Sequence, residues 1–230
     1  MQINRRNFLK IAGVSSAGVV ISKGLTGCSN ASEAKVKPTS SALNNIYDEA
    51  YKKHPQIFNM SGYAAPKLET VRVGVVGLGN RGSFAVERLS YIDGLQIAAL
   101  CDIKSDQVQK AKERIKSTGH PAVEYSGKED SWKEMCESGD IDLVYICTPW
   151  SLHAPIGVYA MEQGKHAAIE VPAATTVEEC WNLVETSEKT KKHCVILENC
   201  CYDFFELLTL NLARNGFFGD IVHTEGGYIH

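Results

Sequence analysis

The chain has 230 residues, of which 44% are hydrophobic and 22% are charged, and its formal net charge is −3. These values are typical of an ordinary globular protein, and the length permits one large domain or one domain plus part of a second. No basic cluster is interleaved with aromatic residues, so we expect no nucleic-acid partner.

The first 28 residues have the features of an export signal. The pair Arg5-Arg6 is typical of a twin-arginine signal, and residues 11–21 form an apolar run too short to span a membrane. Residues 25–28, Leu-Thr-Gly-Cys, resemble a lipoprotein cleavage box, which predicts a lipid on Cys28. We expect a membrane anchor that faces the periplasm or the cell surface. The alternative is a disordered basic leader that holds a cysteine by chance.

Residues 29–61 are expected to link this leader to a folded domain. Ser, Ala and Lys dominate residues 29–42, a composition typical of a flexible tether. Residues 43–53 are predicted to form a short helix, and a dinucleotide-binding domain is expected over residues 62–200.

A glycine-rich turn after a short apolar strand is the most informative feature of the chain. Residues 71–76, Val-Arg-Val-Gly-Val-Val, predict a strand, and Gly77-x-Gly79-x-x-Gly82 follows directly. In this motif the first glycine permits the turn, the second lets the backbone approach a pyrophosphate, and the third lets the helix pack on the strand. The phosphates then lie on free N–H groups at the helix N-terminus.

An acidic residue supports this interpretation. Asp102 closes the next predicted strand, 25 residues after Gly77, where a carboxylate can bind the hydroxyls of the adenosine ribose. Asp102 favours NAD over NADP because it would repel a 2′-phosphate, whereas Arg81 could serve such a phosphate. The alternative is a βαβ unit with a tight turn and a solvated aspartate.

Strands and helices alternate from residue 71, which predicts an α/β fold of the Rossmann type with a doubly wound parallel sheet. The start of an incomplete α+β substrate domain is expected over residues 201–230. Ser105 and Thr176 are predicted N-caps, the latter in a capping box with Glu179. The predicted strands are 71–76, 95–101, 141–147, 165–170, 193–198 and 220–229, and the predicted helices are 82–92, 105–117, 130–138, 153–163, 176–191 and 204–215.

Three loops follow strands that should end at one edge of the sheet. They contain Thr148-Pro149-Trp150-Ser151-Leu152-His153, Glu170-Val171-Pro172 and Glu198-Asn199. Ligands of open α/β sheets bind beyond the carboxyl ends of the strands, so these loops predict a site for the nicotinamide half of the cofactor. His153 as a solvated helix residue and Trp150 as ordinary packing are the alternatives.

The seven cysteines beyond Cys28 form no C-x-x-C pair, and no His/Cys spacing suits zinc, so no metal site is predicted. Cys101, Cys147 and Cys194 lie in strand-like runs, where a cysteine is usually a small buried hydrophobe. Core packing is also the expectation for the adjacent pair Cys200-Cys201.

These loops resemble the Gfo/Idh/MocA oxidoreductase family, whose members carry the glycine motif, a Thr-Pro-x-x-x-His loop and a Glu-Lys-Pro loop in this order. In this chain Val171 replaces the lysine that assists hydride transfer, which weakens the interpretation as a plain dehydrogenase. Glu-Val-Pro is similar to the glycoside hydrolase family 109 branch, the NAD-dependent α-N-acetylgalactosaminidases.

The likeness to this branch covers about residues 45–230, but the family is longer, so we expect either a fragment or a truncated gene product. The resemblance implies a glycan substrate with terminal α-N-acetylgalactosamine and a sugar contact at Tyr228. The oligomeric state is left open, a homo-oligomer included. The resemblance further implies NAD contacts at Asn80, Arg81, Asp102, Trp150, His153, Glu170, Val171 and Asn199.

The implied reaction is retaining hydrolysis without net redox change: oxidation at C3, elimination, addition of water and reduction. Tyr202 follows the Glu198-Asn199 loop and is a candidate for proton transfer at C2, with a core tyrosine as the alternative. His230 is a candidate catalytic orienter. Two further hypotheses are a periplasmic NAD(P)-dependent sugar dehydrogenase and a non-catalytic NAD-binding chain.

Overall fold

The structure is a computed structural model that describes residues 48–49 and 52–227. Its centre is a six-stranded sheet in the order β3-β2-β1-β4-β5-β6, and every neighbouring pair is parallel. The strands are β1 (Val71–Val76), β2 (Leu95–Asp102), β3 (Val123–Ser126), β4 (Leu143–Ile146), β5 (His166–Ile169) and β6 (Cys194–Ile196).

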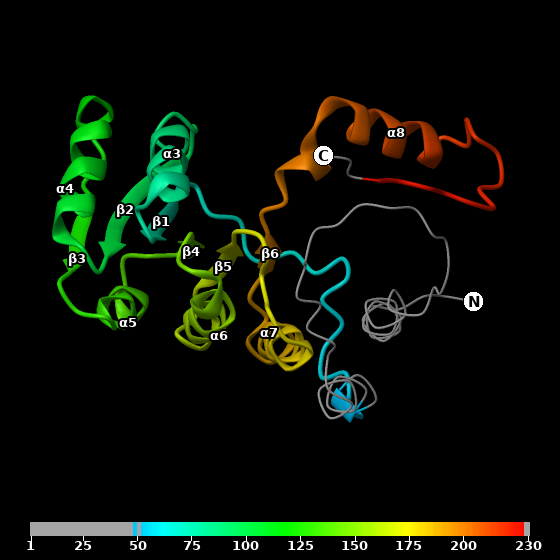
Figure 1. Ribbon diagram of the computed structural model, residues 1–230, viewed down its shortest axis with the longest axis horizontal. Coiled ribbons are helices and arrows are strands. Elements are labelled where there is room, and N and C mark those ends of the chain that lie inside the picture. Colours follow the sequence, from blue (N-terminus) through cyan, green and yellow to red (C-terminus); the bar gives the residue numbers. More distant parts are fainter. Residues whose placement is uncertain (1–47, 50–51, 228–230) are drawn as a thin grey trace, which may run out of the picture.

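Helices cover both faces of this sheet (Figure 1). Helices α3 and α4 lie on one face, and α5, α6 and α7 lie on the other. Their bounds are α3 (Asn80–Leu89), α4 (Ser105–Arg114), α5 (Ser131–Glu137), α6 (His153–Glu162) and α7 (Val177–Thr190). Short 3₁₀ helices are η1 (Lys116–Thr118), η2 (Trp150–Leu152) and η3 (Asn199–Tyr202).

The two faces hold separate hydrophobic cores because side chains alternate along each strand. Val73 and Val75 of β1 pack with α3 and α4, whereas Val76 packs in the core under α5, α6 and α7. Strand β1 is therefore apolar on both faces, as expected for a central strand of a doubly wound sheet.

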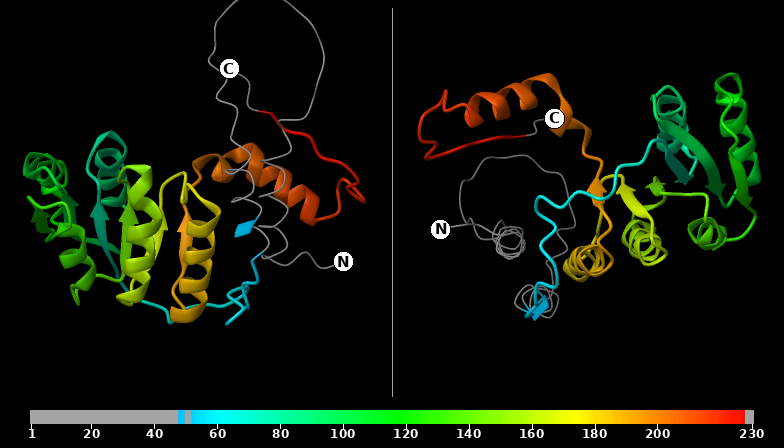
Figure 2. Two further views of the ribbon diagram at one scale, coloured as in Figure 1. Left: turned by 60° about the horizontal axis from the view of Figure 1, so that its bottom comes forward. Right: turned by 180° about the vertical axis from the view of Figure 1, so that it is seen from behind.

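The strand order reverses between β1 and β4, since β2 and β3 extend the sheet one way and β4, β5 and β6 the other. The order is that of the doubly wound dinucleotide-binding fold, which binds its ligand at this switch point. The predicted Rossmann-type fold is therefore confirmed, and the loops after the strands meet at one edge (Figure 2).

Most predicted elements are present with shorter bounds. Thr176 accepts a hydrogen bond from the N–H of Glu179 and forms the predicted capping box. Ser105 is not an N-cap, since Lys104 holds that position and Ser105 is the first helical residue. Strand β3 was not predicted, because its four residues are exposed or half-buried and carry little hydrophobic signal.

The last predicted elements differ more. Helix α8 (Phe204–Arg214) lies beyond the β6 edge of the sheet, close to its prediction. The strand predicted over residues 220–229 is wrong for residues 220–227, which form no strand. A strand needs a neighbouring strand to bond its backbone groups, and no sheet pairing includes these described residues. Of the helix predicted over 43–53, only residues 48–49 are described as helical, and the others lie outside the described residues or in a bend.

The seven cysteines in the described part of the chain are all free thiols. Cys101 and Cys136 are buried, and Cys147, Cys180 and Cys194 are half-buried. The pair Cys200-Cys201 is exposed, so the expectation of core packing for it was wrong, since the 3₁₀ helix η3 contains no buried residue. Within the described ranges no helix combines the length and apolar character needed to cross a membrane.

Helix α3 packs against the turn before it through glycines, with no side chain between them. A Cβ added at Gly82 would lie 1.8 Å from the carbonyl oxygen of Gly77, and a Cβ at Gly77 would lie 2.6 Å from the Cys147 backbone. Gly77 also has a φ of 86°, in the left-handed region that favours glycine. Residues 77 and 82 therefore need to be glycine for the sheet edge to keep its shape.

We expect Gly82→Ala to lower the free energy of unfolding by about 1–3 kcal/mol, because backbone atoms must move to admit the methyl group. Gly139→Ala is the matched control, since a Cβ there meets open space and φ is not positive. Denaturant unfolding of both variants measures the difference. Equal stability of the two variants would contradict the close packing described here.

Candidate functional site

The strand ends place the predicted site residues at one edge of the sheet. The loop after β1 holds Gly77 and Gly79, Gly82 lies in the first turn of α3, and Asp102 is the last residue of β2. The loops after β4, β5 and β6 bring the remaining predicted groups to the same edge, namely Trp150, His153, Glu170, Val171 and Asn199.

The glycine turn leaves an open surface beside the first turn of α3. Gly79 is the N-cap of α3, and no side chain caps the helix. A Cβ added at Gly79 would meet nothing within 4 Å, so the backbone is bare on this side. The first N–H groups of a helix have no intrahelical acceptor, and together with the helix dipole they attract an anion. This geometry fits the pyrophosphate of a dinucleotide.

Asp102 joins this turn to the loop after β2. One carboxylate oxygen accepts a hydrogen bond from the Leu78 N–H at 2.7 Å, and the other accepts one from the Lys104 N–H at 2.9 Å. Each carboxylate oxygen has a second lone pair for a further donor. Asp102 is therefore fixed at the edge of the sheet, and its oxygens can still accept hydrogen bonds from ribose hydroxyls.

Two cavities flank the switch point along this edge. The first, of about 410 Å³, is mainly apolar and lies on the β2 side, with Gly77, Asp102, Ile103 and Pro149 in its lining. The second, of about 350 Å³, lies at the ends of β4, β5 and β6. Its lining comprises Arg81, Cys147, Thr148, Trp150, His153, Glu170, Val171, Glu198 and Asn199. A dinucleotide laid across the switch point would place one half in each cavity.

Thr148 lines both cavities, and its hydroxyl lacks a hydrogen-bond partner among the described residues although it is buried. An unsatisfied buried hydroxyl costs free energy that a polar ligand can recover. Three features of the edge therefore fit a dinucleotide. They are the Thr148 hydroxyl without a partner, the accessible backbone at Gly79 and the fixed carboxylate of Asp102.

In the second cavity a buried carboxylate holds two other side chains. Oε1 of Glu170 accepts a hydrogen bond from the Tyr145 hydroxyl at 2.9 Å and pairs with Nε of Arg81 at 2.8 Å. The hydrogen bond to Glu170 raises the pKa of Arg81. Burial, followed by the hydrogen bond to Glu170, raises the pKa of Tyr145, which therefore stays a neutral donor. The Arg81 side chain thus lies at the second cavity and pairs with Glu170, and it does not pair with Asp102.

His153 is buried and joins two of the loops. Its Nδ1 lies 2.7 Å from the carbonyl oxygen of Pro172, and its Nε2 lies 2.7 Å from that of Thr148. This burial excludes the alternative that His153 is a solvated helix residue. The ring holds the loops after β4 and β5 at a fixed separation, and Trp150, which is exposed, forms the outer wall of the cavity.

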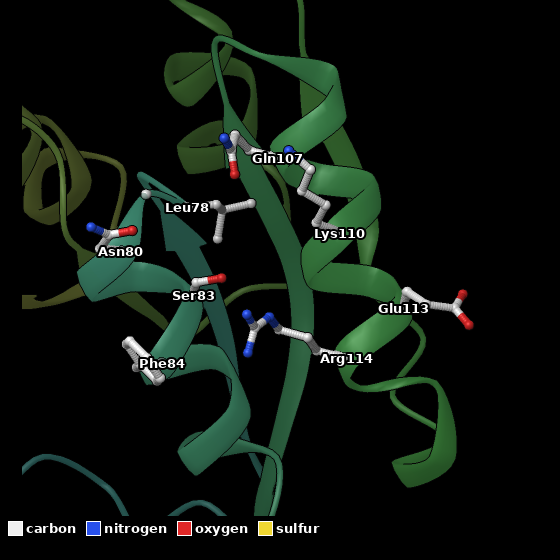
Figure 3. A pocket seen from close by; sticks show the side chains of 9 residues that line it. Leu78, Asn80, Ser83, Phe84, Gln107, Lys110, Glu113 and Arg114 are labelled. Atoms are coloured by element: carbon white, nitrogen blue, oxygen red, sulfur yellow. The ribbon is translucent and has the colours of Figure 1, made fainter.

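A third cleft lies on the other side of the glycine turn, between α3 and α4 (Figure 3). It measures about 710 Å³ and includes Asn80, Ser83 and Arg114 in its lining. Arg114 pairs with Glu87, and Lys110, at the same cleft, pairs with Asp106. Apart from Gly79 and Asn80 it contains none of the predicted site residues, so the chemistry predicted from the strand ends belongs to the other two cavities.

The remaining predicted residues are not brought into the cavities. Tyr202 lies at the end of η3 and is exposed, so the alternative of a core tyrosine is excluded, and it lines neither cavity at the strand ends. Tyr228, His230 and Cys28 lie outside the described residues. Among the described residues, no group of three or more His, Cys, Asp or Glu side chains could hold a metal ion.

Tyr145 was not identified from the sequence, and Thr148 and Glu198 were named as members of the site loops without a role for either residue. Tyr145 pairs in register with Ala168 of β5, two residues before Glu170, and this neighbouring position explains the hydrogen bond. A tyrosine inside an otherwise aliphatic strand, one strand away from a terminal glutamate, is the signal that could have identified it.

Comparisons with known proteins agree with this geometry. A "Glycosyl hydrolase family 109 protein" of Porphyromonas gingivalis is 63% identical over 166 residues, which cover 72% of this chain and 36% of that protein. An "Alpha-N-acetylgalactosaminidase" of Bacteroides fragilis is 54% identical over 179 residues, which cover 77% of this chain and 42% of that protein. The chain thus spans about two fifths of the length of these curated relatives.

The solved structures show the same fold at lower identity. The scyllo-inositol dehydrogenase of Lactobacillus casei, solved with bound NAD(H) and scyllo-inositol, has a TM-score of 0.57 at 22% identity over 66% of this chain and 43% of its own. Residues 71–198 match the model of the Gfo/Idh/MocA family, described as an oxidoreductase family with an NAD-binding Rossmann fold. The match covers more than half of the chain, which therefore belongs to the Gfo/Idh/MocA oxidoreductase family.

Proposed function

We propose that this chain is the cofactor-binding part of an NAD-dependent glycosidase that releases terminal α-N-acetylgalactosamine with retention. The observation that carries this proposal is the 54–63% identity to curated relatives whose names state glycosidase activity. Val171, where dehydrogenases of the family carry a lysine, supports hydrolysis over simple dehydrogenation. Its side chain is partly exposed at the second cavity and cannot transfer a proton.

The residues at the sheet edge divide the binding of NAD between them. The N–H groups after Gly79 would bind the pyrophosphate, and Asp102 would accept hydrogen bonds from the adenosine ribose. The nicotinamide would enter the second cavity beside Glu170, Arg81 and Asn199. Bound NAD would take a hydride from C3 of the sugar and return it later, so no net redox change occurs.

The proton transfers would fall to residues beyond the sheet edge. We propose that Tyr202 removes the proton at C2, that Tyr228 contacts the sugar, and that His230 orients one of these groups. Tyr202 is the last residue of η3, three residues after Asn199, and it is exposed, which supports a role toward a substrate that covers this loop. The assignment of Tyr228 follows the resemblance to the glycosidase branch, whereas those of Tyr202 and His230 follow from their positions in the sequence.

The cofactor prediction concerns Gly79→Val. A branched side chain would occupy the open space where the pyrophosphate must approach, so we expect NAD binding to weaken at least roughly tenfold. Isothermal titration with NAD measures the affinity, and Gly139→Val serves as a control at another glycine with free space around its Cα. NAD binding by Gly79→Val equal to that of the parent chain would contradict the assignment.

The activity prediction concerns Tyr202→Phe. We expect the full-length enzyme that contains this chain to release the aglycone of an aryl α-N-acetylgalactosaminide. In that enzyme we expect Tyr202→Phe to turn over roughly 10²–10⁴-fold more slowly with NAD binding retained. Tyr91→Phe, which changes an exposed tyrosine at the far end of α3, is the matched control.

Three outcomes separate the hypotheses. Accumulation of NADH with a sugar ketone would favour a dehydrogenase. Tight binding of NAD without hydrolysis of any glycoside would favour a non-catalytic cofactor-binding role. Unchanged turnover by Tyr202→Phe would keep the glycosidase and place the base on another residue.

We further propose that the protein is exported by the twin-arginine route and lipidated at Cys28. The pattern Arg5-Arg6 and the box that ends at Cys28 support this proposal. We expect Cys28→Ser to abolish incorporation of labelled lipid and Cys200→Ser, a change at an exposed cysteine, to preserve it. Equal labelling of both variants would place the lipid elsewhere, and a soluble protein with its leader intact would refute the anchor.

A further inference from the structure

Glu170 and Arg81 form the only ion pair between lining residues of the second cavity among the described residues. Glu170 is buried, whereas the Arg81 side chain is about half exposed. The pair spans two separate βα units, since Arg81 lies in the first turn of α3 and Glu170 directly follows β5. It therefore forms a charged wall of the cavity that would receive the nicotinamide.

The other lining groups stay the same when Arg81 or Glu170 is replaced, so a change at the pair changes the charge of the cavity in a defined way. Burial raises the pKa of Cys147 to about 12, so its thiol is neutral at physiological pH. His153 is held by two carbonyl oxygens. Glu198 contributes a second carboxylate, and its Oε1 accepts a hydrogen bond from the Cys200 N–H at 3.2 Å. Tyr145 is neutral and donates to Glu170.

The two redox forms of nicotinamide differ in charge. The oxidised ring carries a positive charge and the reduced ring carries none, so a nearby carboxylate stabilises the oxidised form and a nearby guanidinium destabilises it. In a cavity partly shielded from water these effects are larger than in bulk solvent. With both charges present, the opposing effects of Glu170 and Arg81 largely cancel.

We propose that Arg81 sets the redox balance of bound NAD by neutralising the Glu170 carboxylate beside the nicotinamide cavity. The inference rests on the proposed NAD site. A cofactor that is reduced and reoxidised within one turnover works best when neither form is strongly favoured, and an unpaired Glu170 would favour the oxidised form. Arg81 is thus a positioning residue with an electrostatic role, beyond any contact with phosphate.

The test compares the affinities of the 230-residue chain for NAD⁺ and NADH by titration. Arg81→Gln should raise the affinity for NAD⁺ relative to NADH by roughly tenfold, which corresponds to a midpoint potential about 30 mV lower for this two-electron couple. Glu170→Gln should shift the ratio in the opposite direction, because it leaves Arg81 unpaired. The double variant should restore a ratio near that of the parent chain.

Two controls separate charge from hydrogen bonding and packing. Arg81→Lys keeps the charge and should keep the ratio, and Tyr145→Phe removes one hydrogen bond but no charge and should change both affinities together. Binding of neither nucleotide by the parent chain would refute the proposed NAD site. If the parent chain binds both nucleotides, two results would overturn the redox role alone. One is an NAD⁺/NADH affinity ratio in Arg81→Gln equal to that of the parent, and the other is a shift of this ratio in the same direction in both single variants. Circular dichroism verifies that each variant is folded.

Discussion

The carbonyl oxygen of Gly77 occupies the space where residue 82 would carry a Cβ, and the arrangement of the sheet edge depends on this contact. It brings the start of α3 against the end of β1, while the Cys147 backbone packs on Gly77 from β4. Three elements thus meet without side chains between them. The close approach leaves the helix N-terminus bare at the strand-order reversal, where a dinucleotide phosphate needs it.

On either side of the Gly77–Gly82 contact, a carboxylate connects the glycine turn or α3 to a neighbouring part of the sheet edge. Asp102 ties the turn to the β2 side through the Leu78 N–H, and Glu170 ties α3 to the β5 side through Arg81. Each carboxylate performs a structural task and also faces a cavity. A buried carboxylate is costly unless it is paired, so Arg81 and Tyr145 offset the burial of Glu170. The same pairing determines the charge that a ligand would meet.

The sequence was sufficient to predict the features that depend on short-range patterns. The glycine spacing, the apolar β1 and the terminal Asp102 lie within one βα unit, so their geometry follows from local rules. The pairing of Arg81 with Glu170 could not be predicted in this way, because an arginine at a helix start can turn to either side of the glycine turn. Only the relative placement of β1 and β5 selects the side.

The same distinction explains the errors in secondary structure. Strand β3 was missed because its stability comes from pairing with β2 and not from its own apolar content. The segment after α8 was predicted to be a strand, although strand formation also needs a neighbouring strand. The capping box at Thr176 was correct because both of its partners lie within four residues.

The cysteines of the described residues differ in how accessible their thiols are to reagents. Thiolates, and not thiols, react with disulfides and alkylating reagents, and burial raises the pKa of Cys101, Cys136 and Cys147 to about 12. At neutral pH only about one in 10⁵ of such groups is ionised. The thiols in the core of the sheet are therefore unreactive toward oxidants and alkylating reagents. Such reagents will instead reach the exposed helix η3, where Cys200 and Cys201 follow Asn199 of the second cavity.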